Sequence, residues 1–366
     1  MAIYCFVCAA LDNSLTIIDV TTPATPAFTG NIAGAGTPNF LGSVAFMYKD
    51  GNYCYCGTIA DGTLTIIDIS NPAVPTFVSK LAIGTPGGYK VPFKQGNYCY
   101  VLSANDNSLS IVDVSNPALP SIVGSISGPG TPNFLSNPIG LYKYGDYCYI
   151  CASGDNSLTI IDVTNPAAPA FKGNIAGAGT PNFLSACAFC FVSGTLCYVG
   201  AQGDDSLTII DITNPAIPTF KGKIAGAGNP NYLDGCGVVY KDGNYCYCGT
   251  VDGLTIIDIS DPAIPTFKSN LGGFSGQITV FKQGNYCYVA DILGDALKVV
   301  DVSNPALPSV SGTISGAGTP NFLSYPAFTA TQGYPEPPSP YTSPPCIIDF
   351  KGLLDCIGWK WRAGGI

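Results

Sequence analysis

One apolar segment recurs seven times along this chain, and its spacing limits the possible folds more than any other feature. In the fourth copy, residues 158–169 read LTIIDVTNPAAP. The leucine that opens each copy stands at Leu15, Leu64, Leu109, Leu158, Leu207, Leu254 and Leu297, so neighbouring copies lie 43 to 49 residues apart. A period in the forties, built from strand-like segments, is typical of β-repeat architectures.

Each repeat unit contains four strand-like segments. In the fourth unit these are residues 158–163, 170–175, 186–192 and 196–201, which are rich in β-branched and aromatic residues. Pro, Gly, Asn and Asp separate them, as expected of turns, and no segment has a helical period. Four short antiparallel strands in each of seven units predict an all-β fold, a seven-bladed β-propeller with four-stranded antiparallel blades.

The two ends of the repeat region complement each other. Residues 4–8, YCFVC, match the fourth strand of a unit but lack the strand that should precede it, and residues 325–330 match that missing strand. We therefore expect the N-terminal and C-terminal strands to pair and close the ring, which removes two open sheet edges. The predicted propeller spans residues 1–332, followed by a Pro-rich linker at 333–345 and a short C-terminal docking tail at 346–366.

The units resemble a known repeat. An apolar run closed by Ile/Val-Asp, then Val/Ile-Ser/Thr-Asn/Asp-Pro and a second proline, is similar to the LVIVD repeat, and all seven units match over about residues 3–332. The resemblance implies a β-propeller, often on surface-exposed or secreted proteins. It implies no catalytic residues, because the family has no agreed set.

Composition argues against several classes of function. Only 11% of residues are charged and the net charge is -9, whereas nucleic-acid binding needs clustered Lys and Arg. The chain has no histidine, which excludes His-dependent triads and His metal sites. We expect no enzyme activity, no cofactor, no metal and no membrane span. Five recurring lysines are expected to be solvated turn residues: Lys49, Lys94, Lys143, Lys241 and Lys282.

The 16 cysteines lie mostly in predicted strands. We expect buried free thiols that act as small hydrophobic residues, which indicates folding in a reducing compartment. Cys187 and Cys190 should lie about 10 Å apart on opposite faces of one strand, too far apart to bind one zinc ion.

A loop of the form Gly-x-Gly-Thr/Asn-Pro-Asn-Phe/Tyr-Leu follows five of the units. Its Asn and aromatic side chains are the candidate ligand-binding residues, because an aromatic ring beside an amide suits a sugar or a peptide. Packing of the aromatic ring between blades is the alternative. The candidates are Asn39, Phe40, Asn133, Phe134, Asn182, Phe183, Asn231, Tyr232, Asn321 and Phe322. The Asp that closes each apolar run (Asp162 in the fourth unit) is expected to bond turn amides.

The tail at 346–366 is too short to bury a core of its own. We expect it to dock on a protein partner or on a second copy of the chain. The candidate docking residues are Ile347, Phe350, Trp359, Trp361 and Arg362.

These observations favour a non-enzymatic structural or adhesion protein on an external surface, such as a virion (phage fibre or decoration protein) or a cell-surface assembly. A lectin-like glycan-binding module is the alternative, and a hydrolase or lyase with carboxylates in the central channel is less favoured. The expected location is an extracellular surface or a virion after folding in a reducing compartment, with a cytoplasmic scaffold as a further alternative.

Overall fold

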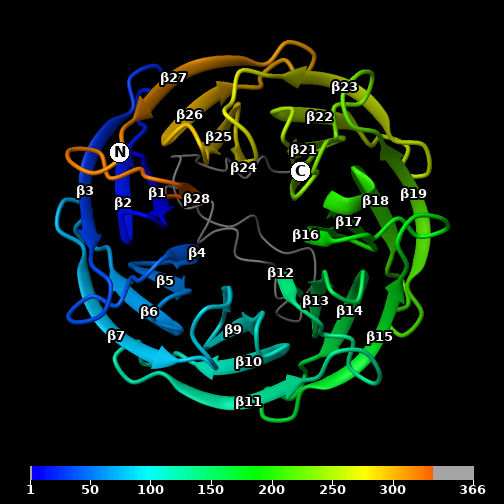
Figure 1. Ribbon diagram of the computed structural model, residues 1–366, viewed down its shortest axis with the longest axis horizontal. Coiled ribbons are helices and arrows are strands. Elements are labelled where there is room, and N and C mark those ends of the chain that lie inside the picture. The colour runs from blue at the N-terminus through cyan, green and yellow to red at the C-terminus, as the bar shows by residue number, and fades with distance from the viewer. Residues whose placement is uncertain (1, 333–366) are drawn as a thin grey trace, which may run out of the picture.

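The computed structural model describes residues 2–332, which form a ring of seven four-stranded antiparallel sheets around a common centre (Figure 1). The predicted all-β, seven-bladed propeller is confirmed. One 3-10 turn, η1 (Gln202–Asp204), is the single helical element in this part of the chain. The predicted linker, the tail and its five docking residues lie outside the described residues.

Each blade consists of four strands, ordered from the centre of the ring to its outer wall. The innermost strands are β28 (Pro326–Gln332), β4 (Val44–Asp50), β8 (Lys90–Gln95), β12 (Pro138–Tyr144), β16 (Cys187–Ser193), β20 (Val238–Asp242) and β24 (Ile278–Gln283). The second strands are β1 (Tyr4–Ala9), β5 (Tyr53–Thr58), β9 (Tyr98–Ser103), β13 (Tyr147–Ala152), β17 (Leu196–Ala201), β21 (Tyr245–Gly249) and β25 (Tyr286–Asp291). The third strands are β2 (Ser14–Asp19), β6 (Thr63–Asp68), β10 (Ser108–Asp113), β14 (Ser157–Asp162), β18 (Ser206–Asp211), β22 (Leu254–Asp258) and β26 (Ala296–Asp301). The outermost strands are β3 (Ala27–Ala33), β7 (Thr76–Ala82), β11 (Ser121–Ser127), β15 (Ala170–Ala176), β19 (Thr219–Ala225), β23 (Thr266–Leu271) and β27 (Ser309–Ser315).

The recurring apolar segment forms the third strand of each blade. In β14, Leu158, Ile160 and Ile161 are all fully buried, because neighbouring blades cover both faces of the sheet. Asp162 ends the strand, and its carboxylate accepts a 3.0 Å hydrogen bond from the backbone N–H of Thr164. The expected turn role of this Asp is confirmed in all seven blades: Asp19, Asp68, Asp113, Asp162, Asp211, Asp258 and Asp301.

The ring closes by pairing its two ends, as the sequence predicted. Strand β28 pairs antiparallel with β1, with Tyr4 opposite Gln332 and Phe6 opposite Ala330. One blade is therefore assembled from both ends of the repeat region, and Figure 1 shows β28 at the inner side of β1 and β2. Without β28, the backbone of β1 would form an open edge.

The long loop between two blades is held by a carboxylate of the blade that it enters. Asp61 accepts hydrogen bonds from the backbone N–H groups of Gly36 and Gly42, at 3.1 and 2.6 Å. Four further blades repeat the contact through Asp12, Asp155, Asp204 and Asp252. These carboxylates therefore fix the loops between neighbouring blades.

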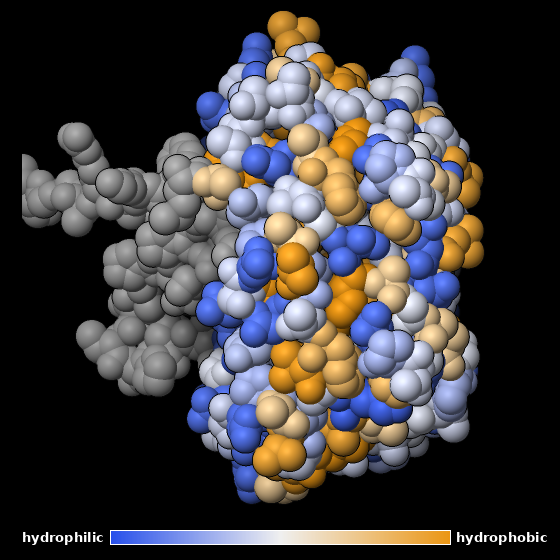
Figure 2. Space-filling view, turned by 90° about the vertical axis from the view of Figure 1, so that its left-hand side faces the viewer, coloured by the Kyte–Doolittle hydropathy of each residue, from blue (hydrophilic) through white to orange (hydrophobic). Residues whose placement is uncertain are grey.

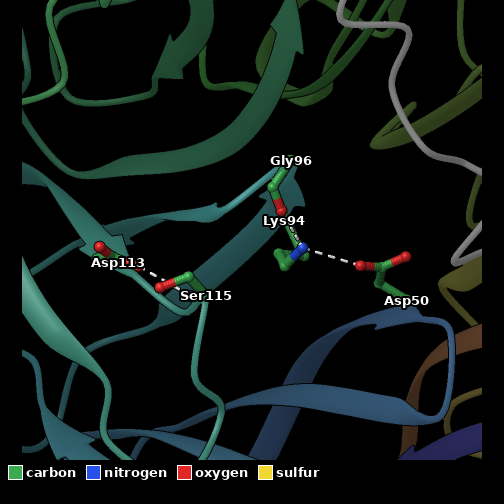
Figure 3. A network of polar contacts seen from close by, with 5 residues as sticks. All are labelled: Asp50, Lys94, Gly96, Asp113 and Ser115. Carbon is green, nitrogen blue, oxygen red and sulfur yellow. Dashed lines mark hydrogen bonds and ion pairs between the residues drawn. The ribbon is translucent and has the colours of Figure 1, made fainter.

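Four of the five recurring lysines are buried, so the prediction that they are solvated turn residues is wrong for these four. Lys49, Lys94, Lys143 and Lys282 are buried, whereas Lys241 is half-buried. Each lies near the end of an innermost strand, where the neighbouring blade covers its aliphatic stem. Figure 3 shows the ammonium of Lys94 between Asp50, 2.8 Å away on β4, and the backbone carbonyl of Gly96. The same view shows Asp113 beside Ser115, which is one of the turn contacts described above.

The outer wall of the ring is formed by the outermost strands. On the side that Figure 2 presents, hydrophobic and hydrophilic residues are interspersed over this wall. Single apolar side chains such as Phe28 and Val310 are exposed there, at 37% and 46%. Scattered exposed apolar residues are normal on a protein surface, so this wall does not indicate a binding site.

Candidate functional site

A circle of aromatic rings surrounds the centre of the propeller. One ring comes from each of six innermost strands, and neighbouring ring centroids lie 4.8 to 6.1 Å apart. The circle comprises Tyr48, Phe93, Tyr142, Phe191, Tyr240 and Phe281. A sequence signal for it existed, because five of these aromatic residues directly precede one of the recurring lysines. We did not predict the circle from this signal.

A second aromatic contact lies at another level of the same centre. The rings of Phe46 on β4 and Phe189 on β16 approach to 5.7 Å, although other blades separate these two strands in the ring. The two side chains therefore meet across the centre. Close packing of this kind makes the central channel a largely filled apolar core.

A cavity of about 70 Å³ remains between these side chains. Its walls come from the innermost strands β4, β8, β12, β16, β20 and β24. Aromatic and aliphatic side chains dominate the lining, among them Phe46, Phe93, Phe189, Val238 and Tyr240. No Asp, Glu, Lys or Arg is among the described residues that line it.

Tyr142 and Tyr240 of the wall are neutral at physiological pH. Burial raises the pKa of Tyr142 well above its ordinary value, with a smaller contribution from Tyr240. Burial is also the main cause of the raised pKa of Tyr240. The cavity therefore offers neutral phenol groups and apolar surface, and this combination favours a neutral guest over a charged one.

Four buried thiols gather at one side of this cavity: Cys151 on β13, Cys187 and Cys190 on β16, and Cys197 on β17. The thiol of Cys190 donates a 3.7 Å hydrogen bond to the backbone carbonyl oxygen of Tyr149 on β13, and interactions with the thiols of Cys151 and then Cys197 lower its pKa. Of the four, Cys190 lines the cavity. The expectation that the repeat cysteines are buried free thiols is confirmed for all those described.

The prediction that Cys187 and Cys190 point to opposite faces is wrong. The register of β16 against β17 shifts between these two residues, which marks a β-bulge or similar irregularity. An extra residue in one strand reverses the alternation of side chains beyond it. Both thiols therefore reach Cys151 on the neighbouring blade.

The five candidate ligand-binding loops do not converge on this cavity. Their aromatic residues contact the outer strands: the ring of Phe40 lies 5.9 Å from that of Phe77 on β7, and Phe183 lies 3.2 Å below the ammonium of Lys223 on β19. Phe134, Tyr232 and Phe322 are likewise paired with outer-strand rings. These five loops are therefore separate sites nearer the outer wall.

Within each of these loops the asparagine amide supports the loop itself. Asn182 donates a 2.7 Å hydrogen bond to the carbonyl oxygen of Ala176, and Asn39 donates to Ala33 in the same way. Asn133, Asn231 and Asn321 repeat the contact. Ligand binding by the loops stays a prediction.

Within residues 2–332, no group of three or more His, Cys, Asp or Glu side chains is arranged to hold a metal ion. The same part of the chain contains no helix with the length and apolar character needed to cross a membrane.

The fold is similar to that of several solved structures, which carry different functional names. A candidate 6-phosphogluconolactonase from Bacteroides fragilis is similar with a TM-score of 0.72 and 10% identity, over 90% of this chain and 98% of that one. The periplasmic gluconolactonase of Pseudomonas aeruginosa is similar with a TM-score of 0.66 and 11% identity, over 92% of this chain and 100% of that one. A protein of unknown function from Desulfotomaculum acetoxidans is similar at 0.66 and 11%, over 86% and 95%. No curated protein sequence matches the chain.

These structures correct the functional prediction made from the sequence. We predicted a non-enzymatic structural or adhesion protein of a virion or cell surface, with a lectin-like module as the alternative and a hydrolase or lyase as the less favoured reading. Propellers that share the fold over nine tenths of this chain are named as lactonases, one of them periplasmic. The architecture therefore does not point to a structural or adhesion role, and that prediction is wrong. At 10 to 11% identity the similarity shows the fold alone.

The sequence repeats themselves match a family described as the LVIVD repeat, at residues 4–33, 49–82, 95–127, 141–176, 190–225, 238–271 and 272–315. The matched segments cover more than half of the chain, with one segment in each blade. The chain belongs to the LVIVD repeat family.

Proposed function

We propose that this protein binds a small, neutral, weakly polar organic molecule in the cavity at the centre of the ring. The observation that carries the proposal is the cavity wall, to which six of the seven innermost strands contribute aromatic and aliphatic side chains. Small-molecule sites are concave, mostly apolar and few in a protein, and they occur where several elements converge.

The size and the charge of the wall restrict the ligand. A cavity of about 70 Å³ has room for roughly five water-sized positions, which suits a compact molecule of several non-hydrogen atoms. A charged ligand would lose its hydration without gaining a partner of opposite charge, because the described wall carries no charged side chain. Neutral molecules of about five non-hydrogen atoms meet both conditions.

Xenon is a suitable probe, because it is apolar and compact and is known to bind in apolar protein cavities. A ligand that binds only the folded state raises its melting temperature, so we expect a saturable rise for the full chain. Val238→Phe should remove the rise by filling the cavity, because Val238 lines it. Val74→Phe is the matched control, because Val74 is 61% exposed and does not line the cavity. An equal response of both variants, or no rise for the unmodified chain, would contradict the proposal.

Hydrolysis of a small cyclic ester in the same cavity is the second candidate. It is favoured by the names of the similar propellers, three of which are lactonases or candidate lactonases. β-Propiolactone is neutral and compact enough for the cavity, and its hydrolysis releases acid that a pH-stat can follow. We expect hydrolysis above the buffer rate for the full chain and for Val74→Phe, and the buffer rate for Val238→Phe. A rate equal to buffer for the full chain would rule this candidate out.

Two expectations about location and partners belong to the same proposal. An exported location is supported by the periplasmic gluconolactonase among the similar structures. Docking of residues 346–366 on a protein partner or a second copy rests on the sequence alone. Removal of residues 333–366 tests the docking on a second copy. Light scattering should give a lower molar mass for the shortened chain than for the full chain. A full chain that is already a monomer would contradict docking on a second copy.

A further inference from the structure

An open pocket of about 440 Å³ lies at the corner between β2 and β3, in the blade that is assembled from both ends of the repeat region. Its lining residues are Ala2, Asp19, Thr21, Thr22, Thr25 and Ala27. None of these residues lines the central cavity. One carboxylate and three hydroxyl groups therefore border a space that is large enough for a small molecule.

Two of these threonines depart from the repeat. At the position of Thr22, the other six blades carry Asn or Asp, whose side-chain oxygen accepts a hydrogen bond from a backbone N–H of the turn: Asn71, Asn116, Asn165, Asn214, Asp261 and Asn304. At the position of Thr25, they carry apolar residues: Val74, Leu119, Ala168, Ile217, Ile264 and Leu307. Within residues 2–332 the hydroxyls of Thr22 and Thr25 form no hydrogen bond, so both are available to a ligand.

The carboxylate of the pocket is available to a cation. Its Oδ1 accepts a 2.8 Å hydrogen bond from the backbone N–H of Thr21. In the fourth unit the equivalent carboxylate, Asp162, lies 3.9 Å from Lys172, but the first unit has Thr29 at the position of that lysine. No Lys or Arg of the described part of the chain forms an ion pair with Asp19. The second oxygen of Asp19 can therefore accept hydrogen bonds from a cationic group that enters the pocket.

We propose that this pocket binds a small amino alcohol, whose primary ammonium group donates to Asp19 and whose hydroxyl group bonds to Thr22 and Thr25. An ammonium group has three donors and no acceptor, so it suits a carboxylate that is surrounded by hydroxyl oxygens. Charge-assisted hydrogen bonds of this kind are stronger than neutral ones. A threonine hydroxyl both donates and accepts, as an alcohol does. The net charge of -9 also favours the approach of a cation.

The same lining disfavours other classes of ligand. An anion would be repelled by Asp19, and the lining contains no Lys or Arg to offset that repulsion. An apolar molecule would displace water from the hydroxyl groups without replacing their hydrogen bonds. The pocket thus differs in its chemistry from the central cavity, and this inference goes beyond the proposed function.

Ethanolamine is the probe, and saturation-transfer NMR on the full chain at low ionic strength is the measurement. We expect a saturable signal, with weaker binding of ethylene glycol, which has no ammonium group, and of propylamine, which has no hydroxyl group. Asp19→Asn should weaken binding of ethanolamine by about tenfold or more, because it removes a hydrogen bond between charged groups. The variant keeps a side-chain oxygen for the N–H of Thr21. Asp68→Asn is the matched control, because Asp68 accepts the same 2.8 Å bond from Ser70 but does not line the pocket.

Thr25→Leu tests the hydroxyl side of the pocket. The variant has the residue that the equivalent corners carry at Leu119 and Leu307, so it should fold as they do. We expect it to abolish binding of ethanolamine, because it removes a hydroxyl group and fills the pocket. Unchanged binding by this variant would overturn the inference.

Three further results would also overturn it. These are the absence of a saturable signal, ethylene glycol that binds as tightly as ethanolamine, and equal weakening by Asp19→Asn and Asp68→Asn, which would indicate attraction to the net charge alone. Displacement of ethanolamine by calcium would assign the pocket to a metal ion and would likewise contradict it. Val238→Phe should leave ethanolamine binding unchanged, so the outcome is independent of the central cavity.

Discussion

The hydroxyl of Thr65 donates a 2.8 Å hydrogen bond to the backbone carbonyl of Phe40, and this bond ties the loop from one blade to the third strand of the next. The loop needs such support because Phe40 has a φ of 50°, in the left-handed region that side chains other than glycine rarely adopt. The same bond recurs four times, from Thr16, Thr159, Thr208 and Thr255 to the aromatic residue of the loop. A side chain of the apolar repeat thus fixes the neighbouring loop.

Thr159→Val should destabilise the protein, because it leaves the carbonyl oxygen of Phe134 without its 2.8 Å hydrogen-bond partner. The cost of an unsatisfied buried acceptor is about 1–3 kcal/mol in the free energy of unfolding. Urea unfolding measures it. Thr279→Val is the matched control, because the buried hydroxyl of Thr279 has no hydrogen-bond partner among the described residues. That change should be neutral or stabilising, and equal losses for the two variants would contradict the explanation.

The Lys94–Asp50 pair should respond unequally to loss of its two members. Their charged groups lie 2.8 Å apart, and the Lys94 side chain is 8% exposed whereas that of Asp50 is 35% exposed. Asp50→Asn leaves a buried ammonium without its counter-charge, which is strongly destabilising. Lys94→Met removes the buried charge and leaves a carboxylate that water still reaches, so its cost should be smaller. Thermal unfolding of both variants tests the order, and a larger loss for Lys94→Met would contradict it.

The fold could be predicted from the repeat because the same local sequence signals recur in every unit. Strand-length apolar runs, closing Asp residues and Asn-Pro corners agree with one another, and the missing strand at the N-terminus identified its partner near the C-terminus. Agreement among local signals of this kind is what makes a fold specific.

The candidate site was not predictable in the same way. The position of Cys190 depends on a register shift in β16. The two-residue alternation of a strand sequence does not predict where such a shift occurs. The burial of Lys94 depends on how closely the next blade approaches, which is a property of the assembled ring. Both features arise from contacts between units, whereas the sequence pattern describes one unit at a time.

Acid should destabilise the protein below about pH 4, through the Asp residues of the turns. Hydrogen bonds from Thr213 lower the pKa of Asp211, and the backbone N–H of Ser260, with its hydroxyl, lowers that of Asp258. A carboxyl whose folded pKa lies below its unfolded value contributes stability above the unfolded pKa, and this contribution is lost as the pH falls through the folded pKa. Melting temperatures from pH 7 to pH 2 should therefore be level at first and then fall. The double variant Asp211→Asn/Asp258→Asn should show a smaller fall in melting temperature. A fall that begins above pH 5 would contradict the explanation.

Closure of the ring gives the last prediction. Strand β28 pairs with β1 along its length, and Phe6, Val7 and Cys8 of β1 are fully buried. Deletion of residues 324–366 should expose the edge of β1, and an unpaired apolar edge is a template for aggregation. We expect a loss of cooperative unfolding and a rise in scattered light on concentration. Deletion of residues 333–366 is the control, because it leaves β28 in place and should keep the cooperative transition. A chain that ends at residue 323, stays monomeric and melts at an unchanged temperature would show that the terminal pairing does not stabilise the ring.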